Sequence, residues 1–126
     1  MARKQTILVV EDDEDLRRLI RTALTLGGYD VEEAGDGLEA LQKIDQALPD
    51  LVVLDLMLPH ISGFVVQQEI AAHVLTRDIP VVIITGSAME LTDLRAACVL
   101  RKPVSPDELI ITIRHCLTHG APGARS

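Results

Sequence analysis

The chain has 126 residues, of which 48% are hydrophobic, and its formal net charge is −7. This length suits one domain with a single core, and the acidic balance argues against the basic surface of a nucleic-acid-binding protein. No apolar run approaches the roughly 20 residues of a membrane-spanning helix, and the start of the chain does not have the pattern of a signal peptide. We therefore expect one cytoplasmic domain without membrane insertion over residues 1–119, followed by a flexible tail over residues 120–126.

Short apolar runs alternate with helical patterns along the chain. The apolar runs predict five strands, over residues 6–10, 30–34, 51–54, 80–84 and 98–101. Apolar residues at helical spacing predict four helices, over residues 14–26, 37–48, 64–75 and from 106 onward. In the second helix we expect Leu38, Leu41 and Ile44 to face the core, and a short further helix can be placed over residues 88–97. This alternation is typical of a parallel sheet with helices on both faces.

The two cysteines, Cys98 and Cys116, have neither CxxC nor metal-site spacing. Free cysteine commonly behaves as a small buried apolar residue, and cytosolic thiols are mostly reduced. We therefore expect both side chains to be reduced and to pack in the core.

Polar residues follow the predicted strands at the point where each strand ends. Asp55 follows one apolar run directly, Glu11-Asp12-Asp13 follows another, and Thr85 and Lys102 follow two more. Because parallel strands end at one edge of a sheet, where open α/β folds place their chemistry, these side chains are expected to converge. An alternative for the acids after the first strand is that they complement the dipole of the following helix.

Converging carboxylates repel one another unless a cation neutralises them, and Mg²⁺ typically binds one or two carboxylates together with waters and phosphate oxygens. A carboxylate can also accept a phosphoryl group as a mixed anhydride. Mg²⁺, Lys102 and Thr85 would then balance the charge on the transferred group. The pattern therefore predicts a phosphoryl-transfer site.

Four motifs in the chain resemble those of the receiver domains of two-component response regulators, over about Ile7 to Leu117. They are Val-Val-Glu-Asp-Asp, Val-Leu-Asp-Leu-Met-Leu-Pro, Ile-Ile-Thr-Gly and Arg-Lys-Pro. The resemblance implies a doubly wound α/β fold, flavodoxin-like, with a five-stranded parallel sheet in the order 2-1-3-4-5. It also implies that phosphoryl groups come from a histidine kinase or a histidine phosphotransfer domain.

The same resemblance assigns roles to individual residues. Asp55 corresponds to the phosphoacceptor, Thr85 to the switch hydroxyl and Lys102 to the counter-ion of the phosphoryl group. The implied Mg²⁺ ligands are Asp12 and Asp55 directly, Glu11 through water, and the backbone carbonyl of Met57. Asp13 falls at a variable position outside the metal site.

Two features depart from the family pattern. Receivers usually carry an aromatic residue three positions before the conserved lysine, and here that residue is Val99. In addition, only 16 residues separate Thr85 from Lys102, several fewer than in most receivers. A valine cannot swing between exposed and buried states as a ring does, and the shorter segment predicts a shortened or irregular helix over residues 88–97. We therefore expect the chain not to signal in the common way through the face built from that helix and its neighbours.

The leading interpretation is a stand-alone receiver that passes its phosphoryl group on, or slowly hydrolyses it, and acts by protein contact on an unknown downstream protein. A fragment of a larger kinase or regulator is also compatible with the sequence. We expect the phosphodonor partner to dock over the first helix, around Leu16, Arg17 and Ile20, and on the loop after the fifth strand. The alternative function is a phosphorylation-independent interaction module. An enzyme of the aspartyl-phosphate phosphatase type is disfavoured, because Met57 stands where its acid/base carboxylate would be.

Overall fold

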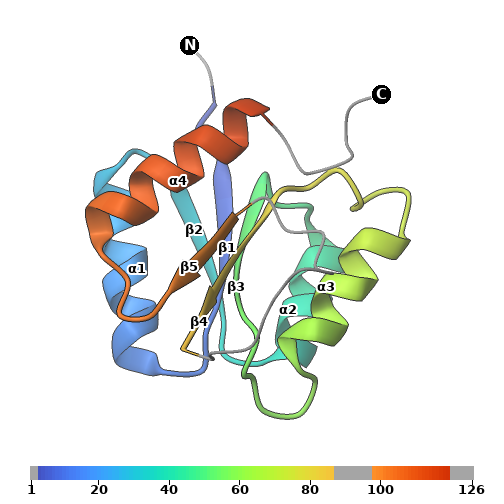
Figure 1. Cartoon of the computed structure of the whole chain (residues 1–126). Helices are drawn as coiled ribbons and strands as arrows, with labels where there is room; N and C mark the ends of the chain where they lie inside the picture. The colour runs from blue at the N-terminus through green and yellow to red at the C-terminus, as the bar shows by residue number, and fades with distance from the viewer. Residues whose placement is uncertain (1–2, 87–97, 120–126) are drawn as a thin grey trace.

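The computed structural model describes residues 3–86 and 98–119. A five-stranded parallel sheet crosses the molecule in the order β2-β1-β3-β4-β5 (Figure 1). Its strands are β1 (Thr6–Val10), β2 (Asp30–Ala34), β3 (Leu51–Asp55), β4 (Val81–Thr85) and β5 (Cys98–Arg101). The predicted doubly wound fold and strand order are therefore confirmed.

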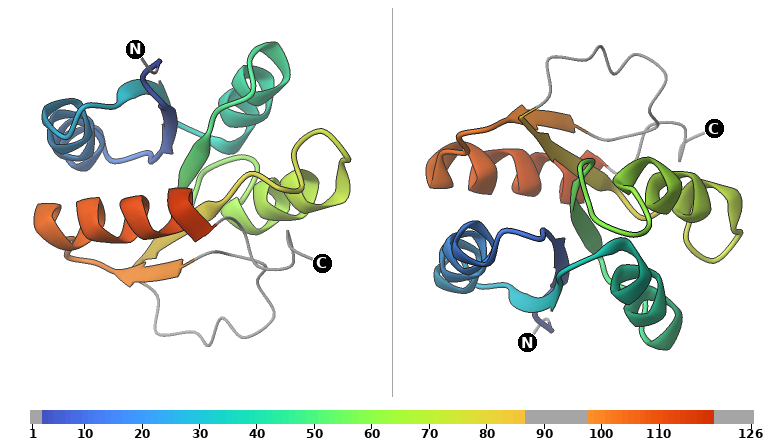
Figure 2. Two further views of the ribbon diagram at one scale, coloured as in Figure 1. Left: turned by 90° about the horizontal axis from the view of Figure 1, so that it is seen from above. Right: turned by 90° about the horizontal axis from the view of Figure 1, so that it is seen from below.

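Helices cover both faces of the sheet (Figure 2). They are α1 (Glu14–Leu26), α2 (Gly37–Gln46), α3 (Gly63–Ala72) and α4 (Pro106–His119). The predicted further helix over residues 88–97 and the predicted tail over residues 120–126 lie outside the described residues. No helix in the described part of the chain is both long and apolar enough to span a bilayer.

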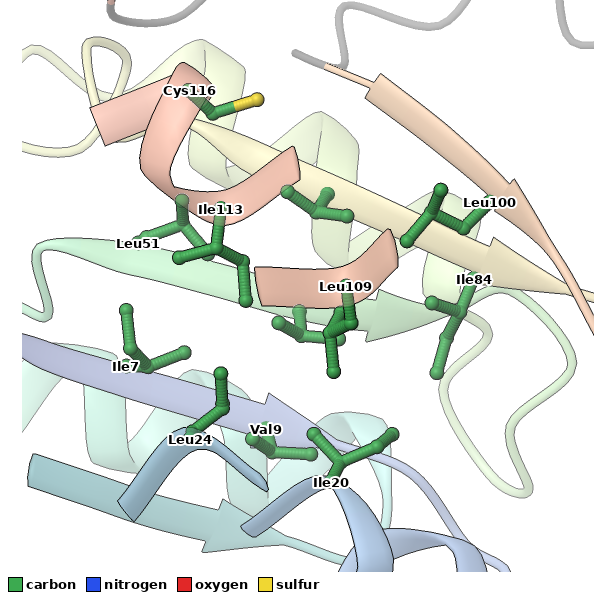
Figure 3. Packing of buried hydrophobic residues seen from close by; sticks show 12 residues of the cluster. Ile7, Val9, Ile20, Leu24, Leu51, Ile84, Leu100, Leu109, Ile113 and Cys116 are labelled. Atoms are coloured by element: carbon green, nitrogen blue, oxygen red, sulfur yellow. The ribbon is translucent and has the colours of Figure 1, made fainter. Parts of the chain in front are cut away.

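Successive side chains of β1 point to opposite faces of the sheet and enter two separate cores. Ile7 and Val9 join the core that α1 and α4 cover, in which Ile20, Leu24 and Ile113 are fully buried (Figure 3). Leu8 and Val10 join the core under α2 and α3. The three central strands are buried on both faces, which explains why their sequences are continuous apolar runs rather than alternating ones.

The predicted inward face of α2 was wrong at Leu38, whose side chain is 51% exposed. Asp36 caps this helix by accepting a hydrogen bond from the Glu39 N–H, at 2.8 Å. The cap fixes the helical register, so that Gly37, Ala40 and Ile44 are the buried positions. Leu38 follows Gly37 by one position, about 100° around the helix, and faces outward.

The predicted third helix was too long, since α3 ends at Ala72 rather than Leu75. The Thr76 hydroxyl donates a hydrogen bond to the carbonyl of Ile70 at 2.7 Å. It thereby satisfies a carbonyl near the end of α3 that lacks a helical partner. Val74 and Leu75 are 70% and 75% exposed in the turn that follows.

Candidate functional site

The three acids after β1 take three different positions. Glu11 is fully buried, and its carboxylate Oε2 accepts a hydrogen bond from the Asp13 N–H at 3.0 Å. Asp13 caps α1, because its Oδ1 accepts from the N–H groups of Asp15 and Leu16 at 3.0 and 3.1 Å. Asp12 lies between them and is exposed. Asp13 therefore serves the helix terminus, whereas the carboxylates of Glu11 and Asp12 lie close to that of Asp55.

Asp55 ends β3 beside β1, where Val10 pairs with Leu54. Its side chain is only 2% exposed, and each carboxylate oxygen has a different partner. The Met57 N–H donates to Oδ1 at 3.0 Å, and the Lys102 ammonium donates to Oδ2 at 3.0 Å. A backbone donor and a cation thus hold the Asp55 carboxylate in one orientation.

Lys102 reaches the site from the end of β5 and bridges two buried carboxylates. Its Nζ lies 2.9 Å from Glu11 Oε1 and 3.0 Å from Asp55 Oδ2. Its backbone N–H donates to the carbonyl of Thr85 at 3.0 Å, which ties the ends of β4 and β5 together. Thr85 itself is fully buried at the end of β4.

Burial and charge shift the pKa values of this group of residues. Burial raises the pKa of Glu11 to about 7, against the opposing effects of the Asp13 N–H and Lys102. Burial disfavours the charged form of Lys102, but its contacts with Glu11 and Asp55 outweigh this effect and raise its pKa above the usual value. Lys102 therefore stays charged at neutral pH, while Glu11 sits near the point where it gains a proton.

The residues at this edge of the sheet fit a hard divalent cation. Glu11, Asp12 and Asp55 each offer a carboxylate oxygen, and these atoms lie within 4.8 Å of one another. Glu11 Oε1 is buried, and the Lys102 ammonium contacts it at 2.9 Å. An all-oxygen set of this kind suits Mg²⁺ better than a transition metal.

The structure brings together most of the residues that the sequence singled out. Glu11, Asp12, Asp55 and Lys102 meet at the predicted edge, and Thr85 lies on the adjacent strand end. The Met57 side chain is 64% exposed, and its described contact with the site is through its backbone N–H.

Arg17 holds the backbone of the site in place, a role that the sequence did not indicate. Its Nη1 donates to the carbonyl of Glu11 at 2.8 Å, and its Nε donates to Glu33 Oε1 at 3.1 Å. Arg21 also contacts Glu33, at 3.2 Å. Glu33 comes next to Arg17 only because β2 pairs with β1. In the sequence the two residues are merely an Arg and a Glu 16 positions apart, and this spacing does not predict a contact.

The predicted docking surface around Leu16, Arg17 and Ile20 was wrong in part. Ile20 is 1% exposed and belongs to the core, and Arg17 is engaged by Glu33 and Glu11. The exposed large apolar residues of α1 are instead Leu19, at 47%, and Leu26, at 84%.

Comparison with known proteins gives one family for the chain and its fold. The model of the response regulator receiver domain matches residues 7–114. Among solved structures, a CheY-like receiver domain protein from Methanospirillum hungatei superposes with a TM-score of 0.86 and 28% identity, covering 93% of this chain and 96% of that one. The receiver domain of the sensor histidine kinase PA1611 from Pseudomonas aeruginosa, solved with a magnesium ion coordinated in its active-site cleft, has a TM-score of 0.85 and 26% identity, with coverage of 92% and 99%.

Curated relatives include regulators of transcription. The phosphate regulon regulatory protein PhoB of Pseudomonas aeruginosa is 34% identical over 124 residues, which are 94% of this chain and 54% of PhoB. The DNA-binding regulator RpaA of Synechocystis is 35% identical over 116 residues, which are 88% of this chain and 48% of RpaA. The chain thus spans about half the length of the curated relatives it matches.

Proposed function

Because the chain belongs to the response regulator receiver domain family, we propose that it accepts a phosphoryl group on Asp55 in two-component signalling. The observation that carries this proposal is the environment of the Asp55 carboxylate. It is 2% exposed, it is held by the Met57 N–H and by Lys102, and it lies beside the acidic pair Glu11 and Asp12. A buried strand-end carboxylate needs such fixed donors to act as an oriented nucleophile.

Asp12, Asp55 and the carbonyl of Met57 would hold Mg²⁺ directly, and Glu11 would contribute through water. The bound ion would supply positive charge to the oxygens of the transferred group. That the PA1611 receiver domain contains magnesium in its cleft supports this assignment by similarity.

The protein's own groups perform the transfer. An Asp55 oxygen forms a bond to phosphorus while the bond from phosphorus to a histidine nitrogen of the donor breaks, and the imidazole keeps the electron pair and takes up a proton. The Lys102 ammonium, 3.0 Å from Asp55 Oδ2, balances the charge on the phosphoryl oxygens, and the Thr85 hydroxyl donates to one of them. We propose no activity toward other substrates.

A histidine kinase or a histidine phosphotransfer domain is the proposed donor. For the output, we propose protein contact or onward phosphotransfer. We propose no nucleic-acid contact by this domain, because its net charge of −7 would repel the phosphate backbone. RpaA is a DNA-binding regulator, and the chain matches only about half of it. Val99, which is 38% exposed on β5, has no ring to move inward, which favours a relay or phosphate-sink role.

Intact-protein mass spectrometry tests the proposal directly. The protein is incubated with Mg²⁺ and acetyl phosphate, alongside Asp55→Asn and a sample with chelator. We expect the parent to gain one phosphoryl group, and neither control to do so. A gain that persists in Asp55→Asn would place the acceptor elsewhere and contradict the proposal.

One observation favours a second function, that of a phosphorylation-independent interaction module. Lys102 already pairs with both buried carboxylates, Glu11 and Asp55, and its charge offsets one of their two negative charges. A fold stabilised in this way does not need a metal ion to be stable. Binding of Mg²⁺ without any phosphoryl gain, from acetyl phosphate or from a phosphorylated histidine phosphotransfer domain, would select this alternative.

A further inference from the structure

The two cysteines lie far apart in sequence and touch in the fold. Cys98 is the first residue of β5, and Cys116 lies three residues before the end of α4. Their sulfur atoms are 3.3 Å apart, with the Cys116 thiol donating to Cys98 across a separation of 18 residues. In Figure 3 the Cys116 sulfur extends from α4 toward the side of the sheet where β5 begins. The expectation that both side chains pack in the core is therefore met by Cys116 and only in part by Cys98, which is partly exposed.

The surrounding structure holds the two sulfurs in this position. Cys116 is 1% exposed and packs in the same core as Leu109 and Ile113, which fixes α4 against the sheet. Cys98 packs at the border of this core and pairs with Val82 of β4. A disulfide needs its sulfurs at about 2.0 Å, so an approach of little more than 1 Å is required, and side-chain rotation can supply it.

The two thiols differ in accessibility. Cys98 is partly exposed, whereas burial and the contact with Cys98 together raise the pKa of the Cys116 thiol to about 12. A small oxidant therefore reaches Cys98 first, and Cys116 is the thiol positioned to react second. The chain contains only these two cysteines, so within one molecule their oxidation can give only one disulfide.

We propose that Cys98 and Cys116 form a reversible disulfide in the folded protein when a hydroperoxide reaches Cys98. The Cys98 sulfur attacks a peroxide oxygen, the O–O bond breaks, and a sulfenic acid and one water (or alcohol) result. The Cys116 sulfur then attacks the Cys98 sulfur, the S–O bond breaks, and the hydroxyl leaves with the thiol proton as water. The two sulfurs lose two electrons in total, and the peroxide gains them. A small dithiol reverses the reaction.

This bond would connect α4 to β5 across the segment that carries Lys102, independently of whether Asp55 is phosphorylated. Cross-linking residues 18 positions apart restricts the unfolded chain. Since the sulfurs are already in contact, the folded state should accept the bond without strain. We expect the oxidised protein to have a Tm at least about 5 °C above that of the reduced protein.

To test the proposal, the whole chain is treated with hydrogen peroxide in small molar excess, and its intact mass is measured without reductant. We expect the loss of two hydrogen atoms, a link between tryptic peptides 96–101 and 115–125, and the return of two alkylatable thiols after dithiothreitol. Cys98→Ser and Cys116→Ala should show no such loss. Cys98→Ser replaces a partly exposed strand-end residue and serves as the control if the core substitution impairs folding.

Three results would overturn the proposal. They are two thiols that remain alkylatable after peroxide treatment, oxygen addition or intermolecular dimers as the main products, and a disulfide form with a lower Tm than the reduced form. The last result would show that the bond forms only by distorting the fold.

Discussion

Gly63 packs directly against the backbone of Asp55. A Cβ built on Gly63 would lie 2.2 Å from the Asp55 carbonyl oxygen and 2.6 Å from the Leu56 Cα, and the Gly63 N–H donates to the Leu56 carbonyl at 3.0 Å. The start of α3 is therefore held against the segment that carries the proposed phosphoacceptor. Only a residue without a side chain allows this approach.

Gly63→Ala should destabilise the protein by about 3 kcal/mol and slow phosphoryl uptake by Asp55. Both clashing atoms are backbone atoms, so the cost of overpacking exceeds the gain in helix propensity of up to about 1 kcal/mol. Urea unfolding and mass spectrometry measure the two effects. Gly35→Ala is the matched control, because a Cβ there would lie 3.5 Å from Arg17 Nη1, an ordinary contact. Equal stabilities for the two variants would disprove the backbone clash.

Lys102→Met should lower the stability of the metal-free protein at pH 8 by about 2 kcal/mol, because it leaves Glu11 and Asp55 buried without their cation. The same change should increase the rise in Tm that Mg²⁺ produces, since an ammonium no longer competes for these carboxylates. Phosphoryl uptake should become slower. Thermal unfolding with and without Mg²⁺ tests this, with Lys43→Met, which removes an ammonium paired with Glu39, as the control. An identical Mg²⁺ response in Lys102→Met and the parent would contradict the prediction.

Arg17→Ala should weaken Mg²⁺ binding roughly tenfold, as is typical for the loss of a group that orients metal ligands. Its guanidinium holds the carbonyl of Glu11 at 2.8 Å and is itself held by Glu33. Isothermal titration calorimetry measures the effect. Arg21→Ala also removes a contact with Glu33 but leaves the Glu11 carbonyl bonded, and it should bind Mg²⁺ as the parent does. If both variants lose affinity equally, the general loss of positive charge is the cause, and Arg17 has no specific orienting role.

Asp50→Asn should destabilise the protein at pH 7 by about 1 kcal/mol or less, with the difference disappearing in acid. Hydrogen bonds from the Arg3 guanidinium and the Thr6 N–H lower the pKa of Asp50. A lowered folded-state pKa means that this stabilisation is complete above the unfolded value of about 4 and is lost as the pH falls through the folded value. Arg3 is 72% exposed, so screening keeps the magnitude small.

Urea unfolding at pH 7 and at several values below pH 4 measures this dependence. Asp45→Asn, a substitution at an exposed position of α2, provides the comparison. A difference between Asp50→Asn and the parent that stays constant down to pH 2 would show that Asp50 acts through packing instead of charge.

The sequence predicted the strands and the edge at which they end because the central strands are buried on both faces and leave continuous apolar runs. Once the sheet is parallel, the acids after β1 and β3 and the lysine after β5 must share that edge. Helix faces were less predictable, because the cap at Asp36 determines that Gly37 and not Leu38 points inward. Arg17 was missed since its partners come from β1 and β2, and only the folded sheet brings them together.

The three consecutive acids after β1 also restrict how this loop can change. Glu11 points into the protein, Asp12 lies at the surface beside the other carboxylates, and the Asp13 side chain caps α1. Deleting Glu11 would put Glu14 at the cap position of α1 and an Asp, one methylene shorter, at the position that contacts Lys102. Inserting one residue before Glu11 would remove the carboxylate from that buried position. Libraries that vary this loop should therefore keep its length fixed, and at position 13 they should retain only Asp, Asn, Ser or Thr.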